Sequence, residues 1–132
     1  MAEQRVQYQY ERLLQTLYNM ASGVCENVFV ENRPAACDQM DEFIVVRLPQ
    51  GIEPYADTHD IAYVQIICFA RDKQKGLVDA VRLSNSVSRV KSLCPFNDGF
   101  ISCNEKPKQA GITSDGTGFH SIVIQFKIVI CL

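Results

Sequence analysis

The chain has no apolar run long enough to span a bilayer and no cysteine pair of the C-x-x-C type. Its most apolar stretch, Ile122 to Leu132, is too short for a membrane helix and contains Gln125 and Lys127. The opening residues, MAEQRVQYQYERLLQ, include no apolar segment of the signal-peptide type. We therefore expect synthesis in the cytosol and no membrane partner.

An excess of positive charge is also missing. The 132 residues include 13 Lys plus Arg and 15 Asp plus Glu, which gives a net charge of -2. Proteins that grip nucleic acid depend on clustered cations that contact phosphates. This balance argues against a dedicated nucleic-acid binder, so no sequence-specific nucleic-acid partner is expected. The length fits one domain, residues 1–132.

Six cysteines are present, but nothing in their context indicates a disulfide framework. Cytosolic thiols are kept reduced, and no secretion signal precedes them. We interpret them as small, buried, apolar residues. Neither histidine lies near a cysteine pair at zinc-finger spacing, and Asp57, His59 and Asp60 are too few for a structural metal site. No metal or cofactor is expected.

Hydrophobic periodicity predicts two helices and four main strands. Apolar residues recur at three- and four-residue steps over 3–22 and again over 73–94, where Asp72 is placed to cap the helix and Pro95 to end it. Strands are predicted over 43–48, 60–70, 100–105 and 121–130, with connecting loops at 49–60 and 106–118. The order α-β-β-α-β-β predicts an α+β two-layer sandwich, in which two helices cover one face of an antiparallel or mixed four-stranded sheet.

The strand at 60–70 is apolar on both of its faces. Ala62, Val64, Ile66, Cys68 and Ala70 alternate with Ile61, Tyr63, Gln65, Ile67 and Phe69. The first set suits a core beneath the second helix. The second set is too apolar for free solvation, so it predicts either a cover from this chain or contact with a partner. We name Tyr63, Ile67 and Phe69 as candidate partner residues.

Charge is unevenly distributed along the chain. Acids dominate between residues 38 and 60, and bases dominate between residues 71 and 91. Opposite poles would favour head-to-tail contacts in a protein that forms rings or stacks, although such runs are usually solvated surface. The pole residues we single out for an interface are Asp57, Asp60, Arg71, Lys73 and Lys75.

A catalytic interpretation needs a nucleophile and a base that meet in space. Cys103 and His120 are the best available pair, since the last two strands could bring them face to face. No Gly-rich turn between a strand and a helix is present to hold a phosphate, because GTGFH precedes a strand. Catalysis is therefore the weaker hypothesis.

The stretch YVQIICFARDKQKGLVDAVRLSNSVSRVKSL resembles the tail-completion or tail-terminator proteins of long-tailed bacteriophages and prophages. The resemblance extends to the N-terminal helix, the link VFVENRP, the strand FIVVRLP and the final strand FHSIVIQFKIVI. It covers nearly the whole chain as an order of elements. Its local signature, the junction ARD between strand and helix, contains no chemically obligatory residue. The cysteine content and the long segment 95–118 depart from the pattern.

The resemblance implies a virion structural protein rather than an enzyme. Such proteins assemble as a ring, commonly a hexamer, on the end of the tail tube, where they stop its polymerisation and meet the head–tail connector. The expected partners are further copies of the chain, the tail tube protein and the connector protein, and the expected location is the head-proximal end of the virion tail. The long loop with Lys106 and Lys108 would suit contacts with neighbouring subunits or with the tube.

Two alternatives stay open. A head–tail connector or neck protein of similar fold would have a nearly indistinguishable sequence. A cytosolic thiol enzyme or small-ligand-binding α+β domain, built around Cys103 and His120, belongs to a different class.

Overall fold

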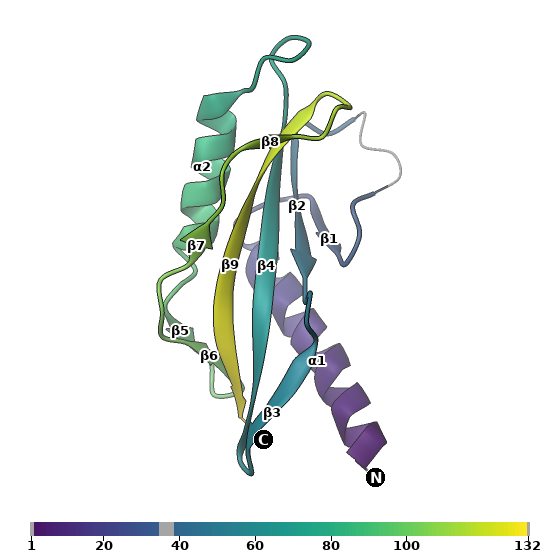
Figure 1. Ribbon diagram of the computed structural model, residues 1–132, viewed down its shortest axis with the longest axis vertical. Coiled ribbons are helices and arrows are strands. Elements are labelled where there is room, and N and C mark those ends of the chain that lie inside the picture. The colour runs from purple at the N-terminus through teal and green to yellow at the C-terminus, as the bar shows by residue number, and fades with distance from the viewer. Residues whose placement is uncertain (1, 35–38, 132) are drawn as a thin grey trace.

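Two long antiparallel strands, β4 (His59–Arg71) and β9 (Phe119–Cys131), form the centre of the computed structural model, which describes residues 2–34 and 39–131 (Figure 1). They pair along their whole length, from His59 opposite Cys131 to Arg71 opposite Phe119. Apolar alternation fixes this register, because a slip of one residue would turn every buried side chain to the other face. The predicted strands at 60–70 and 121–130 are confirmed.

Seven shorter strands complete a mixed sheet around this pair. On the free edge of β4 lie β2 and β3, and β1 runs parallel to β2. On the free edge of β9, β8, β7 and β6 follow one another, and β5 pairs with β6. Their bounds are β1 (Val28–Val30), β2 (Glu42–Arg47), β3 (Ile52–Ala56), β5 (Phe96–Asn97), β6 (Ile101–Cys103), β7 (Lys108–Gln109) and β8 (Thr113–Ser114).

The α+β class is therefore correct, but the predicted four-stranded sheet and the order α-β-β-α-β-β are wrong. Within residues 2–34 and 39–131 the sheet has nine strands, and the elements run α-β-β-β-β-α-β-β-β-β-β. The predicted loops at 49–60 and 106–118 contain three of the additional strands. Strands of two to five residues beside Pro and Gly carry too little alternation to be recognised, and they form because the long edges of β4 and β9 offer backbone partners.

Both helices, α1 (Ala2–Ser22) and α2 (Ala80–Lys91), pack on one face of the sheet, called the inner face below. One apolar core joins buried residues of both helices to the alternating residues of β2, β4 and β9. No helix in the described part of the chain is long and apolar enough to cross a membrane. The helix contribution to the core is Leu13, Leu17 and Ala21 from α1, and Leu83, Val87 and Val90 from α2.

The second helix begins seven residues later than predicted. Asp79 is its N-cap and accepts a hydrogen bond from the Arg82 backbone N–H at 3.2 Å. The preceding residues form a turn in which Gly76 adopts a φ of +78°, a conformation that favours glycine and interrupts a helix. Leu77, in this turn, and Val81, in the first turn of the helix, are both exposed.

Candidate interaction surfaces

The outer face of the sheet, opposite the helices, carries a second apolar cluster at one end. Phe43, Val45, Phe69 and Phe119 are buried there, and we call these four residues the aromatic half of the outer face. Phe43 and Phe69 are cross-strand partners, and their rings stack with 4.5 Å between centroids. Phe119 meets Phe43 edge-on at 5.4 Å. Contacts of this kind add to the stabilisation from burial alone.

Arg33, from the segment after β1, covers the aromatic half. Its guanidinium carbon lies 5.1 to 5.6 Å from the centroids of the three phenylalanine rings. Its Nη1 also pairs with an oxygen of Asp115, from the loop between β8 and β9. Burial raises the pKa of Asp115, but hydrogen bonds from Thr117, Arg33 and Phe119 outweigh burial and lower the pKa to about 2. The ion pair of Arg33 with Asp115 thus covers the aromatic half of the outer face.

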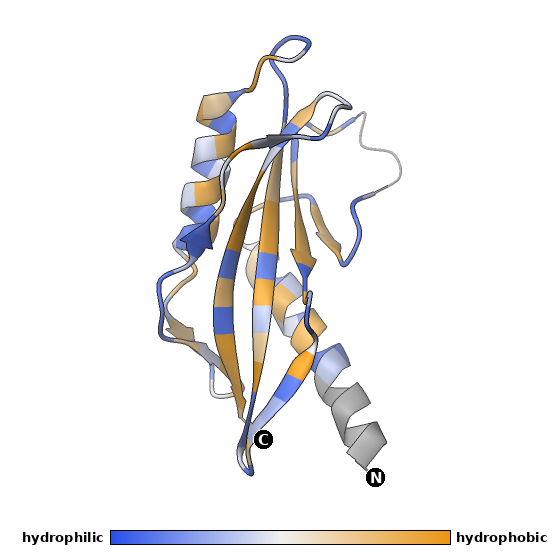
Figure 2. Ribbon diagram, viewed as in Figure 1, coloured by the Kyte–Doolittle hydropathy of each residue, from blue (hydrophilic) through white to orange (hydrophobic). Residues whose placement is uncertain are grey.

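The opposite end of the outer face is not closed in this way. Tyr63 is half-buried and lies opposite Lys127, and Gln65 donates a hydrogen bond to Gln125 at 3.2 Å. We call these four residues the open half. In Figure 2, hydrophilic bands interrupt the apolar colour of β4 and β9 in their central parts. The open half of the outer face is therefore partly polar and partly apolar.

The three predicted partner residues of β4 thus differ in how far they are exposed. Phe69 is only 8% exposed, because the chain's own aromatic half surrounds it, which leaves little of its side chain for a partner. Ile67 is half-buried and packs against the same cluster. Tyr63 belongs to the open half and remains accessible.

The charged residues of the two predicted poles also fall into two groups, those paired within the chain and those that stay exposed. Close to the core, acids and bases pair within the chain: Arg89 Nη2 lies 3.1 Å from Glu42 Oε1, and Arg71 Nε lies 3.6 Å from Asp41 Oδ1. Arg71 also lies over the Phe119 ring, 5.0 Å from its centroid. Arg71 is thus paired within the chain and lies against Phe119, and 35% of its side chain stays exposed.

At the ends of β4 the charges stay accessible. Asp57 is exposed beside the turn between β3 and β4, and Lys73 and Lys75 are exposed in the turn after β4. None of these three forms an ion pair with another described residue. Asp60, by contrast, is only 9% exposed and lies on the inner face, which leaves little of it for a contact with a partner.

Two other predicted interface residues lie elsewhere. Lys106 precedes β7, and Lys108 is its first residue, on the free edge of β9. Both side chains are exposed. The structure therefore does not gather the predicted interface residues into one patch. It distributes them over the open half, the two ends of β4 and the β7 edge.

The tip of the β3–β4 hairpin has a feature that the sequence prediction missed. The pairing register shifts between Pro54 and Ala56, which leaves Tyr55 as the extra residue of a β-bulge. Bulges redirect side chains, and Tyr55 is 73% exposed. The sequence IEPYA follows Pro49 and Gly51 and contains Pro54, so it was interpreted as part of a loop, and this projecting aromatic residue was not noticed.

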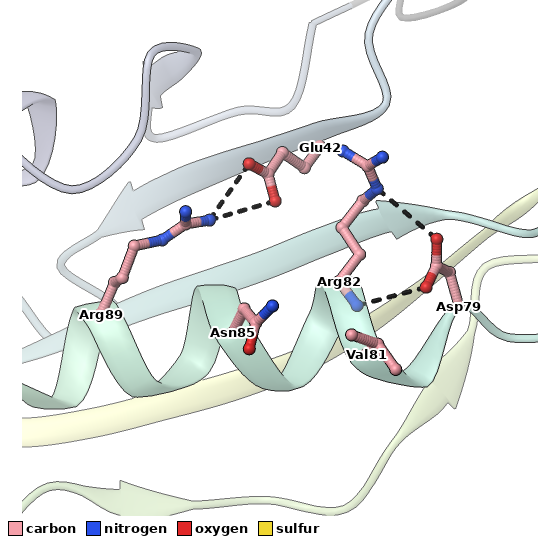
Figure 3. A pocket seen from close by; sticks show the side chains of 6 residues that line it. All are labelled: Glu42, Asp79, Val81, Arg82, Asn85 and Arg89. Carbon is pink, nitrogen blue, oxygen red and sulfur yellow. Dashed lines mark hydrogen bonds and ion pairs between the residues drawn. The ribbon is translucent and has the colours of Figure 1, made fainter.

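A polar groove of about 330 Å³ lies between α2 and β2 (Figure 3). Arg89 donates to both oxygens of Glu42, at 3.1 and 3.2 Å. Arg82 Nε lies 3.5 Å from Asp79 Oδ2, beside the cap hydrogen bond. Each arginine thus has a carboxylate partner, which leaves little uncompensated charge for a ligand. Sequence analysis missed this groove; the acid–base spacing of Asp79 and Arg82 was the available signal.

The predicted pairing of Cys103 with His120 does not occur. Ser102 lies opposite Val129, which places Cys103 near residue 128 of β9, whereas His120 is near the other end of that strand. Eight residues of strand separate the two positions by roughly 27 Å. The His120 ring Nδ1 instead pairs with Asp72 Oδ1, and both side chains are largely buried. This pair ties the turn after β4 to β9.

Two of the described cysteines, Cys68 and Cys94, have an environment opposite to that of an activated nucleophile. Burial raises the pKa of Cys68 to about 12, and burial together with the neighbouring Cys103 raises the pKa of Cys94 to about 12. Cys25, Cys68 and Cys103 are buried, as expected of small apolar residues, whereas Cys131 is exposed at the end of β9. The sixth, Cys37, lies outside the described residues.

The described residues include no group of three or more His, Cys, Asp or Glu side chains that could hold a metal ion. In the predicted candidate region, the His59 ring Nδ1 is 2.7 Å from the Thr58 hydroxyl. One of the two ring nitrogens of His59 is therefore already hydrogen-bonded to the Thr58 hydroxyl.

Comparisons with known proteins indicate the fold but not the role of this chain. No protein-family model matches the sequence, and no curated protein matches it. A solved structure shares 12% sequence identity with it, covers 98% of this chain and 96% of its own, and superposes with a TM-score of 0.61. At this identity the likeness shows that the two chains share an α+β fold, and nothing further.

Proposed function

We propose that this chain is a virion structural protein, which closes the end of a phage tail tube as a ring of copies and joins it to the head connector. The proposal begins from the resemblance of the segment 63–93 and of the element order to tail-terminator proteins. The observation that carries it is the open half of the outer face. A partly exposed aromatic ring beside Lys127 and the Gln65–Gln125 pair suits contact with another protein surface.

Other features agree with an assembly role. The polar groove is internally neutralised, and the thiol and imidazole that could have formed a nucleophilic site lie at opposite ends of β9. A net charge of -2 suits a ring that DNA passes through without being gripped. The chain is then a structural subunit, with itself, the tube protein and the connector as partners.

The test is assembly with and without the cognate tube protein. Native mass spectrometry and negative-stain electron microscopy should detect a ring, expected to be a hexamer, at the end of tubes and tubes of arrested length. A chain that stays monomeric both alone and with tubes contradicts the proposal. Binding to the portal side alone, in disassembled particles, would instead identify a neck protein.

A pair of variants locates the contact. Tyr63→Ser combined with Lys127→Ser should abolish ring formation, because both side chains belong to the open half and lie opposite each other. The matched control is Tyr18→Ser on α1, a residue that is 40% exposed on another side of the molecule. Rings that form equally well from the double variant would rule out the open half as the contact.

A further inference from the structure

The hairpin end of β4 projects an aromatic side chain among acids. Tyr55, turned outward by the bulge, is 73% exposed. Glu53 and Asp57 are exposed on either side of it, and neither forms an ion pair with a described residue. No lysine or arginine occurs from residue 48 to residue 70 to offset them. This end is negative, with an apolar centre.

The opposite end of β4 has the complementary character. Leu77 and Val81 are 51% and 66% exposed, and Lys73 and Lys75 are exposed beside them. The turn that carries these residues is held in shape by two backbone hydrogen bonds of 2.9 Å between Lys73 and Leu77 and between Leu77 and Gln74. Asp72 and Asp79 flank the turn, but their carboxylates pair with His120 and Arg82, so Lys73 and Lys75 are the exposed charges of this end that form no ion pair with a described residue.

One copy of the chain cannot join its own two ends. They are separated by the length of β4, twelve residue steps or about 40 Å, and lie at opposite extremes of the molecule in Figure 1. Since the ends match in charge and each offers exposed apolar surface, we propose that the β3–β4 hairpin tip of one copy binds the turn 73–77 and the start of α2 in the next copy. Complementary charge selects that partner and orients the approach.

The proposed contact joins two different patches, so it is heterologous. Such contacts repeat from copy to copy and close into a ring if the rotation between copies permits. This inference rests on the proposed function in that it adds a second contact between copies of the ring to the one proposed for the open half. It deepens that function by naming a second copy of this chain as the partner of both ends.

Charge reversal tests the contact. One variant combines Glu53→Lys with Asp57→Lys, and a second combines Lys73→Glu with Lys75→Glu. Self-association, measured by sedimentation velocity at low ionic strength, should weaken by roughly tenfold or more in each, because like charges then face each other. The fourfold variant should recover association, and an equal mixture of the two double variants should associate.

Two further variants separate charge from other causes. Glu11→Lys with Glu26→Lys changes the net charge as much as the hairpin variant does, at two exposed sites outside both ends of β4, and should associate like the original chain. Tyr55→Ser should weaken association without any change of charge. Far-ultraviolet circular dichroism checks that every variant is folded.

The outcomes distinguish this inference from the proposed function. If double variants associate as strongly as the original chain, or the fourfold variant fails to recover association while folded, the head-to-tail contact is overturned. An original chain that is monomeric at low ionic strength and high concentration also overturns it. Rings on tail tubes in either case would leave the proposed function intact, and their absence would overturn that function separately.

Discussion

The two halves of the outer face are built from the same pair of strands, yet only one is closed. In the aromatic half, β2 lies alongside β4 and adds Phe43 to the cross-strand partner Phe69. In the open half, β2 reaches only as far as Arg47, opposite Gln65, and the short strand β3, four of whose five residues are exposed, begins its pairing at Ala62. The alternation along β4 continues through both halves, so the pattern of one strand does not decide whether its outer side is covered.

The cover comes from residues far apart in the chain. Arg33 follows β1, and its partner Asp115 lies 82 residues further along. A guanidinium stacked near several rings and held by a carboxylate is a stable arrangement, because arginine is planar and weakly hydrated for a cation. We infer from the comparison that a cover of this kind marks where the fold is complete and that its absence marks where a partner is needed.

The largest expected effect is the loss of a ring from the closed half. Phe43→Ala should lower the free energy of unfolding by about 3–5 kcal/mol, because Phe43 is fully buried and its removal leaves a cavity between two other rings. Urea denaturation followed by circular dichroism measures the change. A loss below about 1 kcal/mol, the range of a surface substitution, would contradict the description of this half as core.

An intermediate effect is expected from pH. The pKa of Asp115 is about 2 in the folded chain and lies below its ordinary value of 3.8, so the folded state favours the ionised form. The resulting stabilisation is present above pH 3.8 and is lost as the pH falls through 2. Its size is on the order of 1–2 kcal/mol after allowance for solvent screening.

Urea denaturation across this pH range measures the Asp115 contribution. Asp115→Asn is the matched variant, since it keeps the shape and removes the charge. It should be less stable than the original chain near neutral pH, and the difference should shrink as the pH falls toward 2. A difference that is constant with pH would mean that the carboxylate charge does not hold Arg33 in place.

The long elements could be predicted from the sequence because their patterns are long. Thirteen-residue strands with strict alternation determine both their extent and their buried face, and the α+β class follows from them and the two helices. The start of α2 could not be predicted in the same way. Asp72 and Asp79 are both plausible caps, and only the left-handed turn at Gly76 selects the second.

The surface was harder to predict because it depends on which segments meet. Runs of acids and bases indicated two poles, but Arg71 and Arg89 turned out to pair with Asp41 and Glu42 within the chain. No sequence pattern states that such residues lie within a few ångströms of each other. The same limit applies to Cys103 and His120, which share one sheet but lie far apart along β9.

The smallest effect on stability is expected in the open half. Tyr63→Ala should change the free energy of unfolding by no more than about 0.5–1 kcal/mol, because the ring is partly solvated and stands opposite Lys127 rather than inside a cluster. Yet the same substitution should reduce ring assembly on tail tubes, measured by the fraction of tubes that stop at a uniform length. Phe43→Ala is the natural comparison, with a large loss of stability. If Tyr63→Ala lowered stability as much as Phe43→Ala does, Tyr63 would be part of the folded core, and the difference between the two halves would disappear.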